Sequence, residues 1–311
     1  MNPVLSGSRR RLHIPLLAAI MLIAPSAIAA TSSGHQRQSN AIAQVKPGIY
    51  SVGADGTGLR PLAEAPEDLR YDSPAWSRSG RWVAFSSPPC DDCPELVYLI
   101  DLARGGKVTR LPGTVPDASR PSWGPADRAL TFVGGPSNSV FTISRQGTGR
   151  RRLTNGRIAH DQSVWSPDGR RIAYTNQQPN GRWDIFVMRS DGSRKRSLTA
   201  TSTSEQQPAW SPDGRSIAFA RQIRGKFAIF VIPADGGRAR RLTPLAVNSQ
   251  QPAWSPDGRQ IAYTQVTGTG TRILVMRADG TGRRRLQTGA GSASAPTWSP
   301  DSRRIAFTLV S

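Results

Sequence analysis

Few residues of this chain have side chains suited to catalysis. His160 and Asp161 are adjacent, and an imidazole beside a carboxylate, with Glu205 as a second acid, could transfer protons as a general acid and base. His160 is the only histidine after His35. The sequence contains no Gly-x-Ser-x-Gly elbow, no His-Glu-x-x-His pair and no glycine-rich phosphate loop. We therefore assign no catalytic residue, metal or cofactor, and expect a protein that is not an enzyme.

The two cysteines form the segment Cys90-Asp91-Asp92-Cys93, with prolines on both sides. A redox role would need a helix N-terminus to lower a thiol pKa, and no helical pattern follows. A zinc site would need two further ligands, and none is nearby. We expect a Cys90–Cys93 disulfide that pins a loop, stabilising the fold by less than the ~3 kcal/mol of a fifteen-residue ring.

A repeated motif indicates which elements must position these side chains. Trp-Ser-Pro-Asp-Gly begins at Trp165, Trp210 and Trp254. Degenerate copies begin at Trp76, Trp123 and Trp298, so the tryptophans recur every 42 to 47 residues. A period near 40–45 with strand-rich units is typical of a β-propeller.

One unit, residues 251–286, shows how a repeat becomes a blade. Apolar and β-branched residues predict strands at 252–254, 261–263, 273–276 and 283–286. Ser-Pro-Asp-Gly reverses the chain after the first strand, and Asp-Gly reverses it after the third. Four antiparallel strands per unit match one propeller blade.

The chain ends predict how the ring closes. The sixth unit stops after two strands, at 305–308, and residues 49–62 align without gaps to 273–286. We therefore predict an all-β fold, a six-bladed β-propeller closed by N-terminal strands that complete the last blade. The repeat tryptophans should pack between blades, with carbohydrate stacking as the alternative for one of them.

The residues just before each first strand should surround one mouth of the central channel. They are the triplets 71–73, 118–120, 160–162, 205–207, 249–251 and 293–295. From this ring we select as candidate partner-binding residues Tyr71, Asp72, Arg120, His160, Asp161, Glu205, Gln207 and Gln251. The alternative is that these groups satisfy loop backbone and channel water.

The N-terminal segment has the features of an export signal. Arg9-Arg10-Arg11 precede an apolar run that ends in Ala27-Ile28-Ala29, a small-x-small cleavage pattern. We expect a signal peptide at 1–30, a flexible linker at 31–46 and the propeller at 47–311, in the periplasm or outside the cell. The alternative is a retained membrane anchor. No other stretch is long and apolar enough to span a membrane.

The formal net charge is +20, and the three arginines of the signal contribute +3 of it. Cations cluster after the turn between the third and fourth strands, at 150–152, 194–196, 238–241 and 283–285. They should form a basic rim that attracts anionic partners, or a merely solvated face. Nucleic acid is an unsuitable partner for an exported protein, whereas an anionic envelope polymer is compatible with this charge.

The repeats closely resemble those of the TolB propeller family, which has WD-like repeats. Besides the Trp-Ser-Pro-Asp-Gly turns, the matching segments are 172–174, 217–219, 185–188, 229–232, Leu198-Thr199 and Leu242-Thr243. The resemblance covers about 48–311 and implies a six-bladed propeller of the bacterial envelope that binds proteins, a lipoprotein among them. The family's N-terminal α/β domain has no counterpart in the short segment 31–46, so we expect the propeller alone.

Together these features predict an exported, non-enzymatic propeller that binds a protein partner through one face and its channel mouth. One alternative is a polysaccharide lyase or hydrolase using His160 with Asp161 or Glu205. Another is a binder of anionic envelope polymer. We expect a monomer.

Overall fold

The described chain forms six four-stranded antiparallel sheets, five of them each made from one sequence repeat and the sixth from both ends of the propeller. The computed structural model describes residues 46–62, 71–90, 92–155 and 158–310. The expected signal peptide at 1–30 and the linker up to residue 45 lie outside these described residues. Within the described part of the chain, no helix has the length and apolar character needed to span a bilayer.

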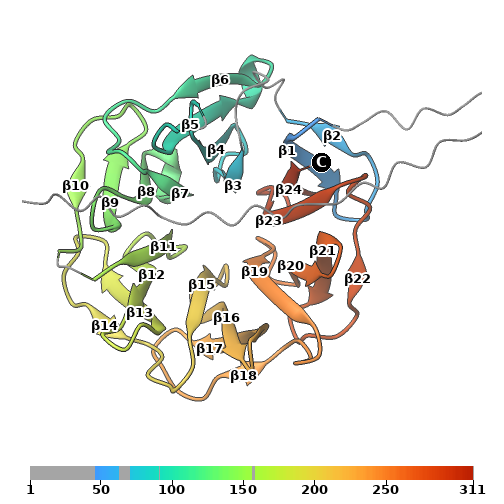
Figure 1. Ribbon diagram of the computed structural model, residues 1–311. Coiled ribbons are helices and arrows are strands. Elements are labelled where there is room, and N and C mark those ends of the chain that lie inside the picture. The colour runs from blue at the N-terminus through green and yellow to red at the C-terminus, as the bar shows by residue number, and fades with distance from the viewer. Residues whose placement is uncertain (1–45, 63–70, 91, 156–157, 311) are drawn as a thin grey trace, which may run out of the picture. The chain divides into compact units, whose positions relative to one another are not determined.

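The first two strands of each blade are the inner ones. The first strands of blades 1 to 6 are β3 (Asp72–Trp76), β7 (Ser119–Trp123), β11 (His160–Trp165), β15 (Glu205–Trp210), β19 (Asn248–Trp254) and β23 (Ser292–Trp298). The second strands are β4 (Trp82–Ser87), β8 (Ala129–Gly134), β12 (Arg171–Gln177), β16 (Ser216–Ile223), β20 (Gln260–Thr267) and β24 (Arg304–Val310). In Figure 1 the first strands surround the centre of the ring.

The third and fourth strands complete each blade outwards. The third strands are β5 (Leu96–Asp101), β9 (Ser139–Ser144), β13 (Trp183–Arg189), β17 (Lys226–Pro233), β21 (Gly270–Arg277) and β1 (Gly48–Gly53). The fourth strands are β6 (Lys107–Arg110), β10 (Arg151–Arg152), β14 (Arg196–Ser197), β18 (Arg240–Arg241), β22 (Arg284–Arg285) and β2 (Arg60–Pro61). Two short 3₁₀ helices, η1 (Leu102–Arg104) and η2 (Pro125–Asp127), occupy turns.

The sixth blade joins the two ends of the propeller, as the alignment of 49–62 with 273–286 predicted. Its strand order is β2-β1-β24-β23, and Tyr50 is the register partner of Phe307. Arg304 reinforces this closure, because its guanidinium donates to the Ser51 carbonyl at 3.0 Å and to the Gly58 carbonyl at 2.6 Å. The predicted closed, six-bladed, all-β fold is confirmed.

The Ser-Pro-Asp-Gly turns are held by their own side chains. In blade 3, the Ser166 hydroxyl donates to Asp168 Oδ1 at 2.5 Å, and that oxygen accepts the Arg170 N–H at 3.0 Å. Gly169 has φ +69°, and a Cβ there would lie 2.4 Å from a side-chain carbon of Pro125 in the neighbouring blade. Only glycine fits this turn, which explains its place in the motif.

The hydrophobic core is divided among the six seams between neighbouring blades. In each seam, buried residues from the second and third strands of one blade pack against the first and second strands of the next. Every repeat tryptophan lies in one of these clusters, as predicted. Trp123, Trp210 and Trp298 also donate their indole N–H to carbonyls of the preceding blade, at 3.0 to 3.2 Å.

The strands differ in length from their sequence predictions. The first strand of blade 5 begins at Asn248 rather than at Pro252, and the fourth strand contains only Arg284 and Arg285. Polar residues such as Gln250 therefore belong to the inner strand. Their polarity hid them from a pattern that looks for apolar residues.

Candidate functional site

The first strands enclose a central channel with a volume of about 570 Å³. Its wall contains the repeat tryptophans together with the prolines of the first strands and first turns. At the end of the channel away from the Ser-Pro-Asp-Gly turns lies a ring of six equivalent residues, which we call the channel ring: Ser73, Arg120, Gln162, Gln207, Gln251 and Ala295.

All six channel-ring residues share an unusual backbone conformation. Their φ angles lie between +40° and +62°, the left-handed region, and none of them is glycine. Each lies within a register shift that bulges the first strand. A left-handed conformation costs a non-glycine residue about 1–2 kcal/mol. The distortion recurs in every blade and brings these residues to the channel wall.

Two of the predicted binding residues, Gln207 and Gln251, link neighbouring members of the channel ring by hydrogen bonds. Gln207 Oε1 accepts the backbone N–H of Gln251 at 2.8 Å. Gln251 Oε1 in turn accepts the N–H of Ala295 at 2.9 Å and the Thr264 hydroxyl at 2.8 Å. Each amide thus links its own blade to the next one, and its oxygen is already engaged.

Arg120 and Asp161 form an ion pair across the seam between blades 2 and 3. Their side chains are 33% and 25% exposed, so the pair is accessible from the channel mouth. Asp161 Oδ1 also accepts the Gln162 N–H at 2.9 Å. These two predicted residues are brought together as a polar, partly exposed group.

The neighbourhood of this pair is acidic. Burial raises the pKa of Asp161, and the nearby carboxylate of Asp72 raises it further, while Arg120 opposes both. Burial likewise raises the pKa of Glu95, with Asp72 and Asp117 adding to the effect and Arg120 again opposing it. Arg120 thus interacts with the carboxyl groups of Asp161 and Glu95, on which Asp72 and Asp117 also act. We call this set, Asp72, Glu95, Asp117, Arg120 and Asp161, the acidic mouth.

Three other predicted residues do not face the channel mouth. Tyr71, His160 and Glu205 are only 6%, 5% and 0% exposed. Each is the first member of its triplet and lies in a seam, whereas the bulge at the third member interrupts the alternation of the strand and brings that residue to the channel wall. Burial raises the pKa of Tyr71 to about 12 and lowers that of His160 to about 4. His160 is therefore neutral at physiological pH.

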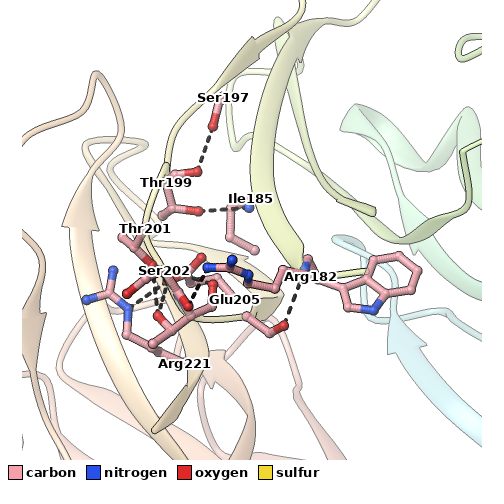
Figure 2. Close-up of polar contacts among 11 residues, drawn as sticks. Arg182, Ile185, Ser197, Thr199, Thr201, Ser202, Glu205 and Arg221 are labelled. Carbon is pink, nitrogen blue, oxygen red and sulfur yellow. Dashed lines mark hydrogen bonds and ion pairs between the residues drawn. The ribbon is translucent and has the colours of Figure 1, made fainter. Parts of the chain in front are cut away.

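Glu205 is the centre of a buried polar cluster between blades 3 and 4 (Figure 2). Its Oε1 accepts hydrogen bonds from the Thr201 and Thr203 hydroxyls and from Arg221 Nε at 2.9 Å. The guanidinium of Arg221 also packs over the ring of Phe230 at 4.7 Å. Arg221 was not predicted, although it is the register partner of Glu205 across the first turn and could have been found by counting residues along the hairpin.

Asp184 contributes a second carboxyl group to this cluster from the adjacent blade. It is 8% exposed. Burial and the hydrogen-bonding contact with Glu205 raise the pKa of Asp184 to about 7, against the opposing charge of Arg182. Glu205 Oε2 accepts no N–H or hydroxyl among the described residues, which leaves it for the Asp184 proton. No motif in the sequence around Asp184 predicted its contact with Glu205.

The remaining chemical candidates are distributed as follows. Cys90 and Cys93 are joined by a disulfide, with 5.0 Å between their Cα atoms. No cluster of three or more histidine, cysteine or acidic side chains suited to a metal occurs in the residues that the structure describes. His160 and Glu205 occupy different seams and are closed to solvent, so they do not assemble an acid–base pair around a substrate.

These features define a closed six-bladed propeller with a polar, acidic mouth on one face. The chain belongs to the TolB β-propeller domain family, whose model matches residues 46–302. The predicted membership is confirmed.

Solved structures with similar folds support this assignment of the architecture. A putative TolB from Agrobacterium tumefaciens aligns with a TM-score of 0.74 and 21% identity, over 85% of this chain and 98% of that one. TolB from Acinetobacter baumannii gives a TM-score of 0.69 and 21% identity, over 81% of this chain and 66% of that one. An oligogalacturonate lyase in complex with manganese gives 0.58 and 11%, over 84% and 82%. At these identities the likeness concerns the fold alone.

Proposed function

We propose that this protein is an exported, non-enzymatic propeller that docks a protein partner at the acidic mouth. The Arg120–Asp161 pair carries the proposal, because it is a polar group held open to solvent at the end of the channel. Membership of the TolB family supports protein binding as the mode of action, and a lipoprotein of the cell envelope is the partner class that the family suggests.

The charge of the mouth indicates what the partner offers. The acidic mouth has four carboxyl groups and one guanidinium, and two of the carboxyl groups, Glu95 and Asp161, have a raised pKa because they are partly desolvated. A docking segment with a lysine or arginine side chain would compensate these carboxylates. The raised pKa values mean that Glu95 and Asp161 lose their charge earlier on acidification than ordinary carboxylates, so capture should weaken at acidic pH.

A charge swap separates binding from folding. Arg120→Asp alone and Asp161→Arg alone leave like charges together, whereas the double variant restores the ion pair in reverse order. A photo-crosslinker at Ser119, beside the pair, reports capture by the exported protein from an envelope extract. We expect both single variants and the swap to lose the wild-type crosslink, and the swap to recover the melting temperature.

The control is a crosslinker at Arg224, an exposed position on the same face but outside the channel. Equal yields at both positions, or full recovery of the crosslink by the swap, would show that the pair serves the fold only. Fractionation of the producing cell tests export, and recovery of the full-length chain only from the cytoplasm would contradict it.

The enzymatic alternative has weaker support. His160 and Glu205 are buried, and Glu205 is committed to Arg221. A screen on envelope polysaccharides addresses this alternative directly, since turnover abolished by His160→Ala would revive it.

A further inference from the structure

The first turns of the six blades place one arginine each on the same face of the propeller. The residue after the turn is Arg81, Arg128, Arg170, Arg215, Arg259 or Arg303, and all six are exposed. Antiparallel strands put the first and third turns of every blade on the same side, opposite the acidic mouth. We call this side the turn face and the six arginines the turn ring.

The arginines of the turn ring form few direct ion pairs. Arg81 pairs with Asp101 at 2.8 Å, but the other five guanidiniums form no ion pair or hydrogen bond within the described residues. The aspartates of the same turns attract these arginines electrostatically without pairing with them directly, because their oxygens bind groups of the turn itself. Asp168 accepts the Ser166 hydroxyl, which lowers its pKa, together with a backbone N–H, and Asp213 is held in the same way by Ser211.

Further cations at the third turns deepen the positive charge. In blade 3 a groove of about 850 Å³ contains Arg170 and is flanked by exposed Arg189, Arg194 and Lys195. Asp235 at its edge is already paired with Arg171 at 3.0 Å, and the groove keeps an excess of positive charge.

Blade 5 repeats the arrangement at equivalent positions. A groove of about 630 Å³ there is lined by Arg259, Arg277 and Arg284. Blade 4, between the two grooves, adds exposed Arg215 and Arg238. The turn face of blades 3 to 5 therefore has an excess of cations, which we call the basic track, although exposed aspartates of the same turns are interleaved with them.

We propose that this track binds a linear anionic polymer with repeated phosphate or carboxylate groups. Guanidinium forks match both groups in geometry, and a row of them suits a chain better than a single small anion. Association with a lipid surface would be helped by exposed apolar anchors. The only large hydrophobic residues that the described structure exposes are Ile158 and Val310. Both lie on the face of the mouth, away from the turn face.

The test uses two matched triple variants, each removing three positive charges. Arg170→Gln/Arg189→Gln/Arg194→Gln removes three cations from the blade 3 groove. Arg224→Gln/Lys226→Gln/Arg272→Gln removes three cations from the opposite face. Binding of labelled long-chain polyphosphate and of polyglutamate is followed by fluorescence anisotropy between about 50 and 200 mM salt. Melting temperatures confirm that both variants fold.

We expect the groove variant to bind at least one of these polymers about tenfold or more weakly, and its log–log salt slope to be shallower by about 2. The opposite-face variant should stay within about twofold of wild type. Equal weakening of both variants would show a response to net charge alone and overturn the proposal. So would absence of binding at low salt, equal binding of neutral dextran, or phosphatidylglycerol vesicles that bind more tightly than either polymer with the same dependence on the groove arginines.

Discussion

Asp184 and Glu205 place two buried carboxyl groups in contact across the seam between blades 3 and 4. Two carboxylates in such a site repel each other, so one proton is retained at a pH where a free aspartate would be ionised. Asp184 holds that proton because Glu205 is already compensated by Arg221. The seam is therefore a place where the stability of the propeller depends on pH.

The first prediction concerns this proton. The folded-state pKa of Asp184 is about 7, against an unfolded value of 3.8, so its contribution to stability is fully present below pH 4 and is lost as the pH rises through 7. Asp184→Asn keeps a donor at every pH. We expect the variant to gain up to about 4 kcal/mol over wild type between pH 4 and pH 8.

Urea unfolding at several pH values measures this gain. Asp92→Asn, an exposed substitution outside the seam and the acidic mouth, is the control and should follow wild type across the range. A constant difference between Asp184→Asn and wild type from pH 4 to pH 8 would contradict the shared proton.

The second prediction concerns ring closure. Arg304→Lys loses the planar fork that joins Ser51 and Gly58 to the last strand. Two or three lost hydrogen bonds correspond to roughly 1–3 kcal/mol. Hydrogen exchange should accelerate first in β1 and β24, whereas Arg303→Lys, at an exposed neighbour without a side-chain bond, should leave exchange unchanged. Uniform acceleration in all blades would argue against a local clasp.

The third prediction concerns the channel ring. Ala295 has φ +53°, so Ala295→Gly relieves backbone strain that offsets the loss of a buried methyl group and the added freedom of the unfolded chain. Ala293 is buried in the same strand without a positive φ. We expect Ala295→Gly to be at least about 1 kcal/mol less destabilising than Ala293→Gly in chemical denaturation. Equal costs would mean that the left-handed conformation is not strained.

The fourth prediction concerns the disulfide. Thiol labelling of the denatured, unreduced protein should detect no free cysteine, because Cys90 and Cys93 are bonded. Cys90→Ser/Cys93→Ser should lower the free energy of unfolding by less than about 3 kcal/mol, since the ring that it opens is short. Two reactive thiols in protein isolated from an oxidising compartment would contradict the bond.

The fold could be predicted because each repeat contains the residues that determine its own turns and strands. The Ser-Pro-Asp-Gly turn sets a hairpin, and the alignment of 49–62 with 273–286 identified the strands that close the ring. The seam position of the tryptophans followed from the same periodicity. These features are local or repeated, so one sequence is enough to reveal them.

The candidate site could be predicted only in part. Arg120 and Asp161 were found because they begin equivalent strands, yet Tyr71, His160 and Glu205 were assigned to the mouth although they point into seams. No particular residue type marks the bulge that turns the third residue of each triplet into the channel, so the sequence did not reveal it. Asp184 lies in β13 and Glu95 just before β5, and their approach to the site depends on how the blades pack.

The outermost strands have a consequence for the behaviour of the protein in concentrated solution. In β10, β18 and β22 the whole strand is a pair of exposed arginines, and β14 is Arg196 with Ser197. So short a row of amide and carbonyl groups gives an incoming molecule almost nothing to extend, and the like charges repel a second copy at the same place. The short, positively charged outer strands therefore protect these blades against edge-to-edge association of propellers into fibres, even at high protein concentration.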